Sequence, residues 1–150
     1  MAQTFSASVG AWAAKSRRRI DYIVKASTQR VFMQANHGVP VDTGFAQASF
    51  RATLNSPDVS VTFRPMNTPA GQNQGGSQSF FPDDNAVALV IAGATIGKDV
   101  IYGTWVANYV SYLEYGTQGR PALGFVRKAA QDWQMIVDQV TLEAQTRIGE

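Results

Sequence analysis

The chain has 150 residues, of which 45% are hydrophobic and only 16% charged, with a formal net charge of +2 and no cysteine. This length suits one domain with a sizeable core, and the apolar content excludes wholesale disorder. The lack of cysteine excludes a disulfide framework, a zinc ribbon and a thiol nucleophile. The weak net charge gives no argument for a nucleic-acid binder. His37 is the one histidine that could serve in a catalytic triad.

Motifs for membrane insertion, export and cofactor binding are not found in the sequence. No apolar run reaches the roughly 18 residues of a membrane span, and residues 1–14 lack the basic start and apolar centre of a signal peptide. The glycines of 71–76 are not followed by Gly-Lys-Ser/Thr, and the acidic residues show no metal-ligand spacing. We therefore expect a cytosolic protein without a cofactor, a metal or a membrane partner.

The first predicted element is a long helix over about 8–36. Apolar residues recur there near the 3.6-residue period, and Gly38 followed by Pro40 is a stop signal. At 1.5 Å per residue such a helix would be about 42 Å long, so we expect part of it to project from the domain.

The same helix is strongly basic, with six Lys and Arg residues against Asp21 as its one acidic residue. Arg17, Arg18 and Arg19 are candidates for a contact with DNA or with the lumen of a DNA conduit, because phosphate binding needs flexible cations on one surface. Three consecutive helical residues spread over about 200° of the circumference, so a solvated helix face is the alternative that we favour.

Residues 39–44 predict an ordered turn, in which Asp42 bonds backbone N–H groups and Gly44 takes a positive φ. Asp42, Thr43 and Gly44 also spell the triplet of dimeric aspartic proteases, where two carboxylates share a proton. Because such triplets are common in turns and the protease fold is almost all β, we favour the turn.

Two short strands are expected over 48–54 and 58–64, joined by a tight turn. Residues 65–82 then form a long loop rich in Gly, Asn and Gln. Phe80 and Phe81 close this loop, either as a docking anchor for a neighbouring subunit or as a pin to the domain's own core. We expect the loop to become ordered only on assembly.

Four more elements follow. Residues 84–94 fit a buried strand or helix, and the Asp-Asp-Asn before them favours the helix. Residues 100–106 predict a strand, 108–115 a short helix and 121–147 a last helix that starts at a proline. The last helix carries an apolar stripe of Val126, Ala129, Ala130, Trp133, Val137, Val140 and Ala144.

These elements predict one α+β domain over residues 1–150, in which long N-terminal and C-terminal helices pack on a small antiparallel sheet and a long polar loop interrupts the chain. Trp133 and Val137 are expected to face the sheet, because they belong to the stripe of the last helix.

Glu114 lies at the C-terminal end of the predicted short helix, where the helix dipole disfavours a negative charge. We therefore expect an arginine to hold it. Arg120 and Arg127 are near in sequence, and Arg51 is a candidate in space. The pair either lies within one chain or crosses to another copy.

Two separated motifs occur in a fixed order. The first is Pro40-Val41-Asp42-Thr43-Gly44 with a strand after it, and the second runs from Asn108-Tyr109-Val110 through Leu113-Glu114-Tyr115-Gly116-Thr117 to Pro121-Ala122-Leu123-Gly124-Phe125-Val126-Arg127. This set resembles the phage tail-completion (neck) proteins, minor tail components of lambda-like long-tailed phages, over about 10–145. The chain departs from that pattern at Phe45, where a basic residue is frequent, and at Phe50, where a tryptophan is common.

The resemblance implies a structural virion protein of the head–tail connection rather than an enzyme. It implies assembly in the host cytoplasm into a ring, most often of six subunits, that joins the tail to the DNA-filled head. The implied partners are other copies, other neck proteins, the tail terminator and tail tube, the head-side connector and, in passing, genomic DNA. We expect the subunit or ring interface to include Asp42, Thr43, Gly44, Phe80, Phe81, Glu114, Tyr115, Gly116, Arg120 and Arg127. A small nucleic-acid-binding module and the dimeric protease are the alternatives.

Overall fold

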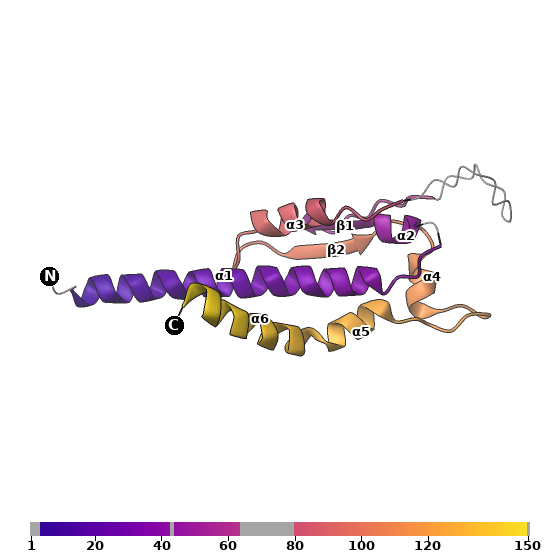
Figure 1. Ribbon diagram of the computed structural model, residues 1–150. Coiled ribbons are helices and arrows are strands. Elements are labelled where there is room, and N and C mark those ends of the chain that lie inside the picture. Colours follow the sequence, from indigo (N-terminus) through magenta and orange to yellow (C-terminus); the bar gives the residue numbers. More distant parts are fainter. Residues whose placement is uncertain (1–3, 43, 64–79, 150) are drawn as a thin grey trace.

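The computed structural model describes residues 4–42, 44–63 and 80–149, and three layers are built around one central helix (Figure 1). The central helix is α1 (Phe5–His37). On one side lie β1 (Phe50–Leu54), β2 (Ile101–Trp105) and α3 (Asp84–Gly93), and on the other side α5 (Phe125–Gln131) and α6 (Trp133–Ile148). The short helices α2 (Phe45–Ala48) and α4 (Val110–Tyr115) lie near the C-terminal end of α1. The predicted α+β class, with long terminal helices and a small antiparallel sheet, is confirmed.

Helix α1 confirms the first predicted element and extends it by three residues at its start. The Thr4 hydroxyl caps the helix by accepting from the Ala7 N–H, and Gly38 ends it. Its 33 residues span about 50 Å. The first turns of α1 extend past the ends of α3 and α6 in Figure 1, so the expected projection is also confirmed.

The predicted hairpin is wrong. Strand β1 pairs antiparallel with β2, far along the chain, with Phe50 opposite Trp105. Of the predicted strand at 58–64, the described residues form only an isolated bridge between Thr62 and Ala107. The distant pairing brings Gly103 of β2 against two aromatic rings, where an added Cβ would lie 2.8 Å from the Phe50 ring.

Residues 84–94 form the helix that the sequence favoured. The Asp83 carboxylate caps α3 by accepting from the Ala86 N–H at 2.9 Å. Val87 and Ile91 of this helix are buried against Phe50, and Phe32 of α1 completes the cluster with a ring contact to Phe50 at 5.4 Å. The sheet is therefore held between α3 and α1.

The predicted last helix starts too early and is not one straight element. Gly124 takes a left-handed φ of +62°, so the helix begins only at Phe125. Residues 121–123 are not helical, and the chain bends again at Asp132, between α5 and α6. The proline at 121 is thus a loop residue that precedes the helix.

Helix α6 packs on α1 rather than on the sheet. Ile136, Val140 and Ala144 are its buried residues, whereas Trp133 is 41% exposed. The expectation that Trp133 and Val137 face the sheet is therefore wrong, because α1 lies between α6 and the strands. Phe125 of α5 makes the contact that the last helix was expected to make, with its ring 5.4 Å from that of Trp105.

No helix in the described ranges combines the length and the hydropathy that a membrane crossing requires.

Candidate functional site

The two motif halves meet in one hydrophobic cluster at the end of the molecule that carries α2 and α4 (Figure 1). We call this the motif cluster. Its buried residues are Val39, Phe45, Ala46, Ala107, Val110 and Phe125, and Phe80, Trp105, Tyr109, Leu113 and Leu123 pack against them. Segments some 60 residues apart in the chain thus form a single unit, and the described candidate interface residues lie in it or within a few residues of it in the chain.

The first motif makes a close backbone contact. Gly44 has φ +81° and its Cα lies so near the Phe80 carbonyl that a Cβ there would overlap it. The Phe80 ring packs edge-on against Phe45 with 5.1 Å between centroids. Phe80 therefore pins the chain to the domain's own core, the second of the two roles considered for it, while Phe81 is 79% exposed. Thr43 and the loop residues up to 79 lie outside the described residues.

Glu114 is the buried acid of the second motif, with 5% of its surface exposed. Its Oε1 accepts from the backbone N–H and the Nε–H of Arg127, both at 3.2 Å, and its Oε2 accepts from the Val126 N–H at 3.0 Å. The predicted arginine partner is thus confirmed as Arg127, within the same chain. Arg51 instead donates to the carbonyl oxygens of Ala48 and Phe50.

The carboxylate of Glu114 also caps a second helix. The N–H groups of Val126 and Arg127 belong to the first turn of α5, where the positive end of the helix dipole favours an anion. This offsets the unfavourable position of Glu114 at the end of α4. Because the sequence predicted that the last helix starts at Pro121, the N–H groups of Val126 and Arg127 were not expected as partners of Glu114. Gly124 is the sequence signal for the later start, because glycine suits the position before a helix.

The segment after α4 folds back tightly on itself. Gly116 has φ +81°, and a Cβ there would lie 2.7 Å from the Ala122 backbone nitrogen. Thr117 and Arg120 exchange backbone hydrogen bonds at 3.0 and 3.2 Å, which places Arg120 in an exposed turn away from Glu114. The Arg127 guanidinium lies 5.6 Å from the centre of the Tyr115 ring, and that tyrosine is 74% exposed.

Exposed apolar side chains surround the motif cluster. Tyr112 and Tyr115 stand three residues apart on α4 and share a face of that helix. Val41 in the first motif and Phe81 are exposed as well. The cluster therefore has a buried interior, and exposed aromatic rings stand on the residues next to it.

The geometry around Asp42 gives little support to the alternative of a dimeric aspartic protease. Asp42 lies exposed in the turn before α2, and the described residues form helices around a two-stranded sheet rather than a nearly all-β fold. His37 is exposed at the end of α1. The described ranges hold no group of three or more His, Asp or Glu side chains placed to bind a metal ion.

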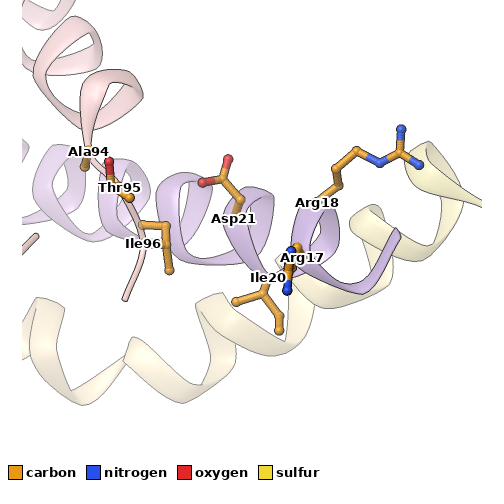
Figure 2. Close-up of a pocket in the computed structure, with 7 residues that line it drawn as sticks. All are labelled: Arg17, Arg18, Ile20, Asp21, Ala94, Thr95 and Ile96. Carbon is orange, nitrogen blue, oxygen red and sulfur yellow. The ribbon is translucent and has the colours of Figure 1, made fainter. Parts of the chain in front are cut away.

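Arg17, Arg18 and Arg19 of α1 do not form one patch. Arg19 donates to the Gly149 carbonyl at the end of α6, whereas Arg17 and Arg18 border an open hollow of about 500 Å³. Figure 2 shows this hollow between α1 and the segment after α3, lined by Arg17, Arg18, Ile20, Asp21, Ala94, Thr95 and Ile96. Asp21 lies within it and pairs with Lys25 at 3.1 Å, which weakens the local positive potential.

Comparison with protein-family models, with curated proteins and with solved structures finds no match to this chain.

Proposed function

We propose that this protein is a structural component of the head–tail connection of a long-tailed phage, and that it forms a ring of identical subunits through the surface of the motif cluster. The observation that carries the proposal is the meeting of the two motif halves. Motifs that stand far apart in sequence share one core, and their exposed residues surround it.

The surface chemistry supports a role in assembly. Only 16% of the residues are charged, so much of the surface is neutral polar or apolar. Tyrosine and other aromatic residues are enriched in protein–protein interfaces, because they bury a large surface area and few of their side-chain torsions become fixed on binding. Tyr112 and Tyr115 are such residues, and the rigid Glu114–Arg127 link holds α4 in place beneath them.

The position of the basic residues is compatible with a passing DNA contact. Arg17 and Arg18 lie toward the N-terminal end of α1, and the motif cluster lies at its other end (Figure 1). A subunit with its motif cluster in a ring interface would therefore keep these two arginines outside that interface.

The test is native mass spectrometry of the purified protein over a range of concentrations. We expect a closed ring, and we expect Tyr112→Ser with Tyr115→Ser to shift it toward monomers while circular dichroism shows an unchanged fold. Leu89→Ser is the matched control, because Leu89 is as exposed as Tyr115 but lies on α3. A protein that stays monomeric at every concentration contradicts the proposal, as does a ring that the tyrosine variant leaves intact.

The nucleic-acid alternative makes a different prediction. A binding module on α1 would bind duplex DNA with an affinity that falls steeply with salt, and Arg17→Gln with Arg18→Gln would reduce both the affinity and the salt slope. Ring formation would be unaffected by the same substitutions.

A further inference from the structure

We propose that the projecting start of α1 pairs with the same segment of a second copy, antiparallel, and that this pairing is separate from the motif cluster. We call residues 5–16 the arm. Its largest side chains are uncovered: Phe5 is 85% exposed and Trp12 70% exposed, and Val9 between them is exposed too. These three residues stand at the i, i+4, i+7 spacing of one helix face.

The exposed stripe continues a face of α1 that is already a helix–helix interface. Farther along α1, this face carries Arg19, which bonds the end of α6, Arg30, which pairs with Glu143 at 2.6 Å, and Gln34, which bonds Asp132. At about 100° per residue around the helix axis, the side chains of these three residues and of the stripe of the arm all project within a sector of α1 about 80° wide. Helix α6 thus covers only part of a seam that runs on along the arm.

The free length of the seam matches a second arm. Helix α6 ends at Ile148, with Gly149 bonded to Arg19, so the seam is exposed at Phe5, Val9 and Trp12, and Ser16 on the same face is half-buried. In an antiparallel pair with Val9 opposite Trp12 of the second copy, Phe5 lies opposite Ser16. Helix α1 of the second copy begins at Phe5, so in this register its first helical residue lies opposite Ser16, three residues before the Arg19 contact with the end of α6. The arm therefore fits itself over its whole length.

The charges and dipoles are compatible with self-pairing. No charged residue occurs between Thr4 and Ala14, and Lys15, the one charged residue of the arm, lies opposite the uncharged Ser6 in this register, so pairing brings no like charges together within the arm. The small residues of the arm, mostly Ala, Ser and Gly, allow close approach of two helices. The C-terminal end of α6 faces the N-terminal end of the incoming α1, where the helix dipoles attract.

The predicted pair is weak when it acts alone. Two phenylalanines and two tryptophans bury roughly 150–250 Å² each, which puts the total at the low end for specific interfaces. We therefore expect a dimer with a dissociation constant in the micromolar range. The inference does not rest on the proposed function, because it concerns a surface at the opposite end of α1 from the motif cluster.

The first test is sedimentation velocity at rising concentration. Trp12→Ala is expected to raise the dissociation constant of the arm-mediated pair at least about tenfold, since a central tryptophan usually dominates a small interface. Trp133→Ala is the matched control, because Trp133 is also partly exposed but lies on α6. If the protein also forms rings, paired arms predict particles of twice the ring mass, and Trp12→Ala should convert these particles into single rings. A variant that loses the single rings as well would instead concern the motif cluster.

The second test uses the absence of cysteine in the chain, which gives disulfide cross-linking no background. Phe5→Cys and Ser16→Cys are prepared separately, and both keep Val9 and Trp12. Antiparallel arms predict a cross-linked dimer when the two variants are mixed and oxidised, and little when either is oxidised alone. Cross-linking of each variant to itself indicates a parallel pair and overturns the proposal. No cross-link in the mixture, or no effect of Trp12→Ala, shows that another partner or none covers the arm, and overturns it as well.

Discussion

Arg127 holds Glu114 from two sides: its Nε donates to the carboxylate at 3.2 Å, and its terminal NH2 donates to the Glu114 backbone carbonyl at 2.9 Å. The backbone N–H of Arg127 donates to the same carboxylate. One residue pair therefore fastens the end of α4 to the start of α5, inside a single chain. This fixes the surface that α4 presents at the motif cluster.

Glu114→Gln should lower the free energy of unfolding by about 1–2 kcal/mol. The amide keeps the shape of the side chain, but it loses the negative charge at the start of α5 and one of the two acceptor oxygens. Denaturant unfolding of the variant and the wild type measures the difference. Arg120→Gln, in the exposed turn, is expected to change the stability by less than about 0.5 kcal/mol. Equal effects of the two substitutions would show that the buried link contributes nothing.

Gly116→Ala should destabilise the fold by about 2 kcal/mol or more, because alanine at φ +81° is strained and its Cβ would press on the Ala122 and Arg120 backbones. Gly119 provides the control, since a Cβ there meets nothing within 4 Å. Thermal unfolding of both variants gives the comparison. A Gly116→Ala protein as stable as Gly119→Ala would mean that the turn after α4 can relax freely.

The two faces of α6 should respond differently to truncation. Ile136 is buried against α1, so Ile136→Ala is expected to cost about 2–5 kcal/mol. Leu142 on the outer face is exposed, and Leu142→Ala should cost less than about 1 kcal/mol. Urea unfolding curves of the two variants test this. A larger loss of stability for Leu142→Ala than for Ile136→Ala would show that the face of α6 with Leu142, and not the face with Ile136, packs on α1.

Acid should weaken the contact between α1 and α6. The hydrogen bond from Arg30 holds the pKa of Glu143 below its usual range, and the Tyr22 hydroxyl supports it. Since the folded pKa is lower than the unfolded value of about 4.3, the stabilisation is present above that pH and is lost as the pH falls through the folded pKa.

The stability difference between wild type and Glu143→Gln should therefore be largest near neutral pH and shrink below about pH 4. Melting temperatures of both proteins across this range supply the measurement. Arg30→Gln should reproduce the same loss, because it removes the group that shifts the pKa. A difference that stays constant with pH would show that the ion pair is not formed in solution.

Local sequence signals predicted most of the helices. The period of α1, the aspartate cap of α3 and the glycine after α4 are each determined by residues within a few positions. The pairing of β1 with β2 is different in kind. It depends on Phe50, Gly103 and Phe32 meeting across long chain separations, and no local pattern encodes such a meeting.

The candidate site was also only half visible in the sequence. The position of Glu114 at the end of a helix predicted an arginine partner, and Arg127 is that partner. The backbone N–H groups that bind the same carboxylate were missed, because they become available only if the helix starts after Gly124, and the predicted start at Pro121 placed them inside the helix. The sequence also could not show whether Glu114 and its arginine belong to the same chain, and only the folded structure answers this.

The most direct test of the proposed function is electron microscopy of the purified protein mixed with tail tubes of a long-tailed phage. A head–tail connection protein should appear as rings seated at one end of the tubes, with Tyr112→Ser and Tyr115→Ser together leaving those ends bare. Tubes that remain bare with the wild-type protein, while the protein itself shows no rings, would contradict the account.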